Sequence, residues 1–260
     1  MSAKVIITAN YKGGVGKSTF QCLLARYLRA IGKTVLMIDE DLQNSTTFHF
    51  VNNQDELEGR SLFYALSTGD IRANIFTTDS GIDLVASSFL LSELRTISNN
   101  KLKQLFESSG IKEDYDFILI DTPPGLDVFS YIAAYVADVI ILPYTLSDFD
   151  IKSTAHAFQK IVENLDKDPT CFVSVANMVN GRITEGEENI NRQFLEMAKS
   201  YFDDLHEGLF SDFRIPLSAP LKKAMARGEI ISAAQNKKAV YDALCDLFEH
   251  ITNTKRPTNF

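Results

Sequence analysis

The sequence predicts an α/β fold, with a single doubly wound, mostly parallel sheet and helices on both faces. Short apolar runs rich in Val, Ile, Leu and Phe alternate along the chain with stretches of helical periodicity. Most of these runs are continuously apolar, as is typical of strands buried on both faces of a parallel sheet. A glycine-rich loop also separates the first apolar run from the first helical stretch.

The order of the elements favours successive strand–helix–strand units. The expected strands are Lys4–Ala9, Thr34–Ile38, Ile82–Ala86, Asp116–Ile120, Val139–Leu142 and Cys171–Ala176. The expected helices are Lys17–Ile31, Leu62–Ser67, Asn99–Ser108, Val128–Val136, Ile151–Leu165, Glu187–Tyr201, Pro220–Arg227 and Lys237–Ile251. No change in composition divides the chain, so residues 1–260 are expected to form one domain. Residues 252–260 are polar and interrupted by proline, which predicts a flexible tail.

The composition excludes several classes of protein. Of the 260 residues, 45% are apolar and 23% are charged, which is ordinary for a globular protein and excludes disorder for most of the chain. The first apolar stretch is too short for a secretory signal, and no run approaches the roughly 18 to 20 apolar residues of a membrane span. The three cysteines lie far apart and the four histidines are scattered, so neither a disulfide framework nor a zinc site is expected. These features together predict a cytoplasmic protein.

The charge is distributed unevenly. The formal net charge is −8, but residues 214–260 contain 8 basic and 4 acidic side chains and therefore carry +4. A basic region on an acidic protein indicates either a solvated charged surface or a polyanionic partner.

The glycine-rich loop at 10–19 has the composition of a phosphate-binding loop. Glycine lets the backbone adopt positive φ and bring its N–H groups close to an anion, and the helix that follows presents its N-terminus to the same anion. A lysine then supplies charge to the β and γ phosphates, a serine hydroxyl suits Mg²⁺, and a threonine lies within reach of the α phosphate. The candidate nucleotide-binding residues are Gly13, Gly14, Val15, Gly16, Lys17, Ser18 and Thr19.

The loop departs from the standard pattern G-x-x-x-x-G-K-[ST], because Tyr11 stands where that pattern has its first glycine. An additional lysine, Lys12, precedes the Gly13-Gly14 pair. The loop resembles the deviant Walker A loop of the ParA/MinD superfamily of ATPases, K-G-G-x-G-K-[ST]. The resemblance implies a P-loop NTPase fold, ATP and Mg²⁺ as cofactors, and a homodimer that sandwiches nucleotide. It also implies that Lys12 reaches the partner subunit's phosphates, so that Lys12 and Lys17 are catalytic and hydrolysis needs the dimer.

Acidic residues follow the second expected strand, where a neighbouring phosphate loop would need a ligand for Mg²⁺ or a group that positions water. The stretch resembles the ParA switch I motif, D-x-D-P-Q-G-N. The resemblance implies that Asp39 supports the metal site and that Asp41 is catalytic, helping to position the hydrolytic water. Three positions differ from the motif: Leu42 replaces proline, Asn44 replaces glycine and Ser45 replaces asparagine.

The fourth expected strand ends in a carboxylate and a stiff Pro-Pro-Gly turn. This segment resembles the Walker B strand and switch II of the same superfamily. The resemblance implies that Asp121 holds Mg²⁺ through a water molecule, together with Ser18. In switch II, Pro124 and Gly125 would bring a backbone N–H to the γ phosphate, a contact that is lost when that phosphate leaves.

The similarity continues outside the catalytic motifs and spans nearly the whole chain. Asn177 follows a strand at the place where the superfamily usually has an adenine-contacting asparagine, and Ile215–Ser218 resembles the passage before the last helices of ParA proteins. The resemblance implies a ParA/Soj-type partition ATPase. In such a protein the ATP-bound dimer binds nonspecific DNA, is nucleoid-associated, and is released when a ParB-like centromere-binding partner stimulates hydrolysis. The DNA-binding candidates are Lys222, Lys223, Arg227, Lys237 and Lys238.

Other members of the superfamily have different sites. A membrane-associated positioning ATPase like MinD needs a basic amphipathic helix, whereas the last helix here carries Asp242, Asp246 and Glu249 on its polar face. We therefore expect that helix to pack on the core, and we expect no membrane partner. A positioning ATPase for another cargo stays an alternative.

A metabolic or redox member, such as an ATPase like the nitrogenase iron protein, needs paired cysteines beside the switch regions. Cys22, Cys171 and Cys245 do not meet that requirement.

Overall fold

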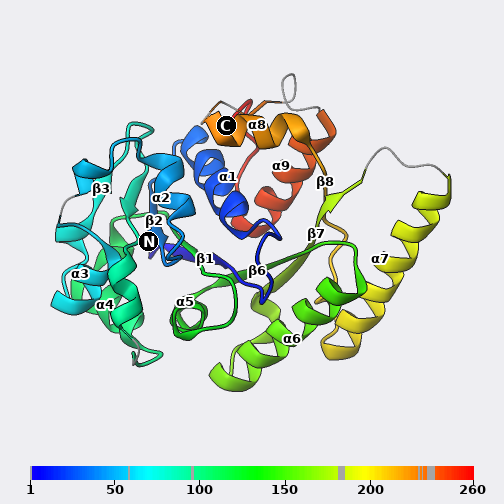
Figure 1. Ribbon diagram of the computed structural model, residues 1–260, viewed down its shortest axis with the longest axis horizontal. Helices are drawn as coiled ribbons and strands as arrows, with labels where there is room; N and C mark the ends of the chain where they lie inside the picture. Colours follow the sequence, from blue (N-terminus) through cyan, green and yellow to red (C-terminus); the bar gives the residue numbers. More distant parts are fainter. Residues whose placement is uncertain are drawn as a thin grey trace.

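A computed structural model describes residues 2–57, 59–94, 97–180, 185–227, 229, 231–232 and 238–260. The described residues form a sheet of eight strands in the order β3-β4-β2-β5-β1-β6-β7-β8 (Figure 1). All neighbouring strands are parallel except the short edge pair β3–β4. The strands are β1 (Lys4–Thr8), β2 (Val35–Asp39), β3 (Phe76–Thr77), β4 (Asp83–Val85), β5 (Phe117–Asp121), β6 (Val139–Tyr144), β7 (Phe172–Val179) and β8 (Arg214–Pro216).

Helices cover both faces of the sheet (Figure 1). The helices are α1 (Lys17–Ala30), α2 (Ser45–Phe50), α3 (Leu62–Thr68), α4 (Lys101–Ser109), α5 (Val128–Val136), α6 (Asp148–Leu165), α7 (Glu185–Leu205), α8 (Ala219–Arg227) and α9 (Lys238–Thr252). Residues of α1, α8 and α9 share one apolar core with the sheet, and residues of α3 to α7 share the other. The predicted doubly wound, mostly parallel fold is confirmed.

The two cores explain why the strands are continuously apolar. Successive side chains of a strand point to opposite faces, so Val5 and Ile7 enter the core beneath α3 to α7 while Ile6 enters the core beneath α1 and α9. Both directions are buried, and all three side chains are fully shielded from solvent. The same division holds in β5, where Ile118 and Leu119 belong to different cores.

The register of the three central strands positions the site. Thr8 at the end of β1 and Asp39 at the end of β2 are both paired in register with Asp121 at the end of β5. The loops that follow these strands therefore leave the sheet side by side at its carboxyl edge, which is where parallel α/β sheets bind ligands.

Two strands and one helix of the described residues are absent from the elements expected from hydrophobic periodicity, although the resemblance placed a strand-to-loop passage at Ile215–Ser218. β3 and β8 have only two and three residues, too few for a recognisable periodicity. The short helix α2 follows the acidic turn after β2, where the sequence shows no apolar stripe.

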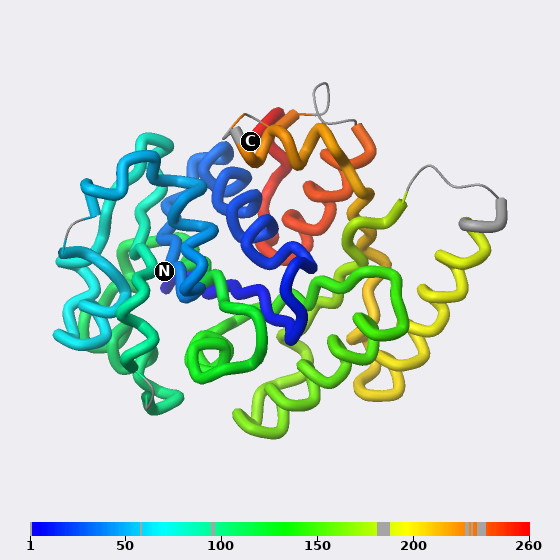
Figure 2. Tube along the Cα trace, in the orientation of Figure 1, coloured from blue at the N-terminus to red at the C-terminus, as the bar shows by residue number. Residues whose placement is uncertain are grey.

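The last residues differ from the predicted flexible tail, because they pack against the body of the protein. The Phe260 ring is 6% exposed and lies 5.6 Å from the ring of Tyr27 and 5.5 Å from that of Tyr241. The Phe260 N–H donates to the Ile231 carbonyl at 2.8 Å, so the end of the trace runs beside the segment that follows α8 (Figure 2). Arg256 forms ion pairs with carboxylates of α9. Burial of an aromatic side chain outweighs the polar composition of this segment.

The packing of α9 agrees with the sequence-based expectation. Its apolar side, including Leu244, Leu247 and Phe248, is fully buried against the sheet. Within the described ranges, no helix combines the length and apolar character that crossing a bilayer demands.

We predict that Phe260→Ala lowers the free energy of unfolding by about 2 to 4 kcal/mol, because it removes a buried aromatic ring and leaves a cavity. Urea unfolding followed by circular dichroism measures the change. Phe89→Ala is the matched control, since Phe89 is 71% exposed and its loss is expected to cost less than about 0.5 kcal/mol. Equal effects of the two substitutions would show that the tail is not part of the folded body.

Candidate functional site

The glycine-rich loop joins β1 to α1 in a conformation that requires glycine. Gly14 and Gly16 have φ of 79° and 103°, in the region that disfavours side chains. A Cβ at Gly16 would lie 2.4 Å from the Asn177 amide nitrogen, so the loop is also packed too closely there for any larger residue. The loop exposes its backbone at the N-terminus of α1, as an anion-binding loop must.

Lys17 and Ser18 stand at the beginning of α1, beside this loop. Lys17 is buried, and its ammonium donates to the Lys12 carbonyl at 3.2 Å. Burial lowers the pKa of Lys17, while the nearby Asp121 and Asp41 carboxylates raise it. A buried ammonium that is held by a carbonyl and lies near two carboxylates is well placed to take an anionic ligand.

Asp121, at the end of β5, is completely buried and only partly hydrogen-bonded. One of its oxygens accepts from the Thr46 hydroxyl at 2.7 Å, whereas Oδ1 has no hydrogen-bond partner among the described residues. Burial raises the pKa of Asp121 to about 6, although Ser18 and Thr46 lower it. A carboxylate with a free buried oxygen next to a serine hydroxyl fits the donor set that Mg²⁺ prefers.

Asp39, at the end of β2, is buried but has its oxygens engaged. Oδ1 accepts from the Asp41 N–H at 3.0 Å, and Oδ2 accepts from the Thr47 N–H at 2.8 Å and from its hydroxyl at 2.7 Å. Burial, followed by the neighbouring Asp121, raises the pKa of Asp39 to about 8. Its contacts make Asp39 a residue that positions the acidic loop and α2. A direct contact of Asp39 with a metal would displace one of these bonds.

The acidic loop after β2 contains the three positions that differ from the switch I motif. Asn44 adopts φ of 55°, a left-handed conformation that glycine adopts freely and that asparagine tolerates better than most residues. Ser45 begins α2. Leu42 packs against the core beneath α3 to α7. Asp41 remains beside the glycine-rich loop, with Oδ1 accepting from the Gln43 N–H at 2.9 Å.

The predicted residues converge on a cavity of about 390 Å³ at the carboxyl edge of the sheet. Its lining contains most of the glycine-rich loop, the acidic loop and one residue of the turn after β5. These residues are Gly13, Gly14, Gly16, Lys17, Ser18, Thr19, Asp41, Gln43, Ser45, Pro124 and Met178. The residues predicted for the nucleotide and metal site that do not line this cavity are Lys12, Val15, Asp39, Asp121, Gly125 and Asn177. Three of the segments that line this cavity follow β1, β2 and β5, and they meet because these strands are neighbours in the sheet. Met178, near the end of β7, completes the lining.

Comparisons with known proteins agree with this geometry. Residues 3–170, more than half of the chain, match AAA_31, a family described as an AAA domain.

The chain belongs to the AAA_31 family.

The proteins similar to this AAA_31 protein indicate which kind of ATPase it is. It is 25% identical to the sporulation initiation inhibitor protein Soj of Bacillus subtilis over 259 residues, covering 95% of this chain and 98% of that protein. It is also 25% identical to a putative plasmid partition protein of Borrelia burgdorferi whose structure was solved bound to AMPPNP. That match has a TM-score of 0.77 and covers 95% of this chain and 99% of the other. The structure of a Cyanothece McdA variant in complex with ATP shares the fold, with a TM-score of 0.82, 19% identity and 98% coverage of both chains. The protein is a ParA/Soj-type ATPase of the ParA/MinD superfamily.

Switch II of this AAA_31 protein is attached to the glycine-rich loop. Gly125, with φ of 92°, donates its N–H to the Tyr11 carbonyl at 3.0 Å. The N–H of Gly125, in the turn that the sequence predicts to bring a backbone N–H to the γ phosphate, is therefore engaged by the protein itself. Reaching a phosphate requires this bond to exchange, which is the behaviour expected of a switch.

Asn177 lines a second cavity, of about 380 Å³, which adjoins the cavity at the glycine-rich loop. The side-chain amide of Asn177 donates to the Val15 carbonyl at 2.8 Å and so stabilises the glycine-rich loop. The second cavity shares Gly16, Thr19 and Met178 with the first and is lined on its far side mainly by apolar residues at 215–225. A mostly apolar cavity that adjoins a phosphate site has the character of a pocket for a base.

The Lys12 side chain lies against α6 of its own chain. Its ammonium forms an ion pair with Asp150 at 2.6 Å and lies 5.7 Å from the centre of the Phe149 ring. The predicted contact with a second subunit therefore requires this pair to open.

The basic candidates fall into three groups. Lys222, Lys223 and Lys238 are exposed, the first two on α8 and the third at the start of α9. Lys222 also lines the second cavity, so its charge acts on that pocket as well as on the surface. For Arg227 the structure describes only the backbone, and Lys237 lies outside the described residues.

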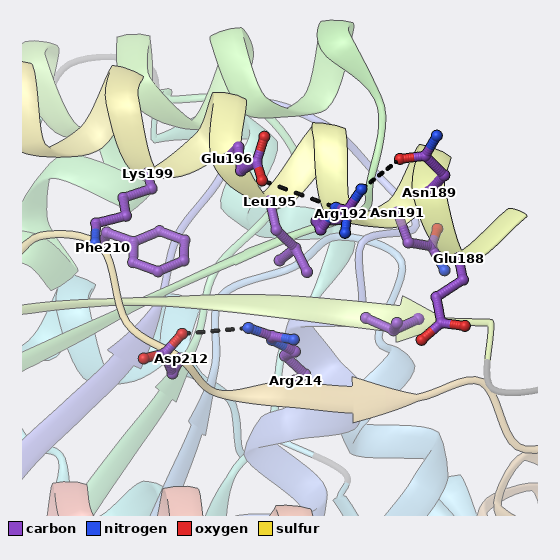
Figure 3. Close-up of a pocket in the computed structure, with 11 residues that line it drawn as sticks. Glu188, Asn189, Asn191, Arg192, Leu195, Glu196, Lys199, Phe210, Asp212 and Arg214 are labelled. Atoms are coloured by element: carbon purple, nitrogen blue, oxygen red, sulfur yellow. Dashed lines mark hydrogen bonds and ion pairs between the residues drawn. The ribbon is translucent and has the colours of Figure 1, made fainter. Parts of the chain in front are cut away.

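A larger cavity, of about 730 Å³, lies between α7 and the edge of the sheet and holds none of the predicted residues among those that line it. Figure 3 shows two exposed ion pairs among the residues that line it: Arg214 pairs with Asp212 at 3.3 Å, and Arg192 with Glu196 at 3.9 Å. Exposed pairs of this kind contribute little to stability.

Sequence reasoning missed several residues that shape the site. Thr46 and Thr47 donate to the two buried aspartates, but a threonine pair after an acidic turn is not by itself a recognisable sequence signal. Glu40, the middle residue of Asp39-Glu40-Asp41, is fully buried, and neither of its carboxylate oxygens has a hydrogen-bond partner in the part of the chain that the structure describes. Burial, with the neighbouring Asp127 carboxylate, raises the pKa of Glu40 well above its usual value. Glutamate is rarely fully buried without a partner, so Glu40 is an exceptional interior group.

His49 fastens α2, and hence both threonines, to α1. Its Nε2 accepts from the Arg26 Nε at 3.2 Å, which requires a neutral ring. Burial, and then the Arg26 charge, lowers the pKa of His49 from 6.5 to about 4.

We predict that acid destabilises the protein through His49. An unfolded histidine binds a proton near pH 6.5, whereas His49 in the fold does so only near pH 4, so the unfolded state gains protons first as the pH falls. The contribution of the neutral ring is complete above pH 6.5 and is lost by pH 4, with a magnitude of about 1 to 3 kcal/mol. Urea unfolding between pH 7.5 and 4.5 tests this: His49→Gln should show a shallower loss of stability than the wild type. Parallel curves for the two proteins would contradict the assignment.

Proposed function

We propose that the protein is a DNA partition ATPase, in which an ATP-bound homodimer binds DNA without sequence preference and hydrolysis, stimulated by a ParB-like partner, releases the DNA. The observation that carries the proposal is the cavity of about 390 Å³ at the glycine-rich loop. There, two glycines with positive φ, the buried ammonium of Lys17 and the carboxylate of Asp41 line one space. The similarity to Soj and to a plasmid partition protein supports the cellular role.

The residues present fit ATP and Mg²⁺. The glycine-rich loop and the N-terminus of α1 would hold the phosphates, the adjoining apolar cavity would hold the base, and Asn177 stands between the two. Ser18 and the unpartnered Oδ1 of Asp121 would hold Mg²⁺. When bound, Mg²⁺ neutralises charge on the β and γ phosphates.

Each polar side chain has a distinct task in hydrolysis. Lys17 stabilises negative charge on the phosphates from within its own subunit, and Lys12 does so from the other subunit. Asp41, on the loop held by Asp39, orients the attacking water. The N–H of Gly125 moves from the Tyr11 carbonyl to the γ phosphate and thereby links switch II to the nucleotide.

The exposed lysines of α8 and α9 supply a surface for DNA phosphates. Lys223 and Lys238 belong to the basic segment of an otherwise acidic chain. Contacts of this kind are nonspecific and weaken steeply with salt. The apolar side of α9 is buried against the sheet, which favours DNA over a membrane as the surface that the dimer binds.

We predict that Asp41→Ala, which removes the water-positioning carboxylate, binds random-sequence duplex DNA with ATP but not with ADP. Fluorescence anisotropy at two salt concentrations measures the binding. Adding Lys223→Glu to this variant should weaken DNA binding at least about tenfold and should reduce its salt dependence, because one phosphate contact becomes repulsive. Lys223 is preferred to Lys222 for this test because Lys222 lines the base cavity.

The control is Lys103→Glu, which reverses an exposed lysine on α4, on the other face of the sheet. Equal DNA binding with ATP and ADP would remove the nucleotide switch from the proposal. Binding that Lys223→Glu leaves unchanged would move the DNA surface elsewhere.

A further inference from the structure

Three consecutive residues at the beginning of the glycine-rich loop contact α6. The Asn10 amide donates to the Thr154 hydroxyl at 2.7 Å, the Tyr11 ring stacks on His156 with centroids 5.1 Å apart, and Lys12 pairs with Asp150. α6 belongs to the layer of helices on one face of the sheet, so this contact ties the loop to the body of its own subunit.

Asp150 is an unusual partner for Lys12, because it is fully buried while the lysine side chain is 43% exposed. The carboxylate lies in the first turn of α6, where the helix dipole favours negative charge. One of its oxygens accepts from the Thr145 hydroxyl, and the other accepts from Lys12 at 2.6 Å. Among the groups of the described residues that donate a hydrogen bond to this carboxylate, the Lys12 ammonium is the one that carries a positive charge.

We propose that Asp150 is a positioning residue that holds Lys12 on its own subunit until the nucleotide phosphates of a second subunit take the lysine over. The opening of this pair then helps to set the protein concentration at which the ATP-dependent dimer forms. The inference rests on the proposed function, in which Lys12 acts across the dimer.

The Lys12 side chain can leave the ion pair, whereas the Asp150 carboxylate stays buried. Lys12 is long, flexible and half exposed, so its ammonium can leave Asp150 without disturbing the core. Asp150 cannot follow it, and after the lysine departs the buried carboxylate keeps only the Thr145 hydroxyl and the helix N-terminus among its described contacts. A triphosphate carries more charge than one carboxylate and therefore competes for the lysine, but a monomer without a partner offers no such competitor.

The test measures dimerisation with AMPPNP, which avoids hydrolysis, by sedimentation velocity across a range of protein concentrations. In Asp150→Asn the lysine is released at lower cost, so the dimer dissociation constant should fall between about twofold and about thirtyfold, since two half-exposed pairs open per dimer. The affinity of the monomer for AMPPNP should stay unchanged, because neither Lys12 nor Asp150 lines the cavity that contains Lys17 and Ser18. A general structural defect would alter both.

Thr145→Val should act in the opposite direction. Without the threonine hydroxyl, Asp150 depends more strongly on Lys12, so the lysine is harder to release and the dimer should weaken. The matched control is Asp148→Asn in the same turn of α6, because Asp148 is exposed and pairs with Lys152 instead of Lys12. It should dimerise like the wild type. Opposite shifts for the two variants are not expected from loss of stability, which circular dichroism monitors in parallel.

Tighter dimerisation of Asp150→Asn together with weaker dimerisation of Thr145→Val supports the proposal. An Asp150→Asn protein that folds and dimerises no more tightly than the wild type overturns it. If that variant does not fold, Thr145→Val decides, and dimerisation that is unchanged or tighter overturns the proposal. A wild-type protein that stays monomeric with AMPPNP overturns the proposed function itself, and with it the role of Asp150.

Discussion

The parallel register of β2, β5 and β1 is the constraint on which the site depends. It places the ends of three strands at one edge of the sheet, with Asp39 and Thr8 both in register with Asp121. The glycine-rich loop, the acidic loop and switch II leave the sheet from these ends and therefore meet without any long connection. The apolar strands hold this arrangement rigidly because both of their faces are buried.

That edge concentrates negative charge in the interior, and the protein limits the cost by hydrogen bonds from the short helix α2. Thr47 holds Asp39 and Thr46 holds Asp121, yet one oxygen of Asp121 finds no partner within the described ranges. A buried carboxylate oxygen without a hydrogen bond is costly, and the nearby Lys17 ammonium offsets part of that cost. The same feature makes the site receptive to a metal, so stability and ligand binding are linked through this one side chain.

Much of this could be predicted from the sequence, because its signals are local. Continuous apolar runs predict buried parallel strands, and the Gly13–Ser18 stretch predicts an anion loop in any context where a strand precedes and a helix follows. What could not be predicted depends on contacts between distant segments. The pairing of Lys12 with Asp150 joins residues 138 positions apart, and the burial of Phe260 opposes the polar composition around it. Asn44 stands where the motif has glycine, and its left-handed backbone is a conformation that glycine adopts freely and asparagine tolerates.

The central claim is that the loop after β1 binds Mg-ATP through the ammonium of Lys17, and isothermal titration calorimetry tests it most directly. The wild-type protein should bind Mg-ATP, and Lys17→Ala should weaken binding by about tenfold or more, because it removes a charge-assisted contact to the phosphates. Lys12→Ala is the control at concentrations where the protein is monomeric: the Lys12 ammonium is turned to Asp150, so its loss should leave monomer affinity unchanged. Equal affinity of Lys17→Ala and the wild type would contradict the account.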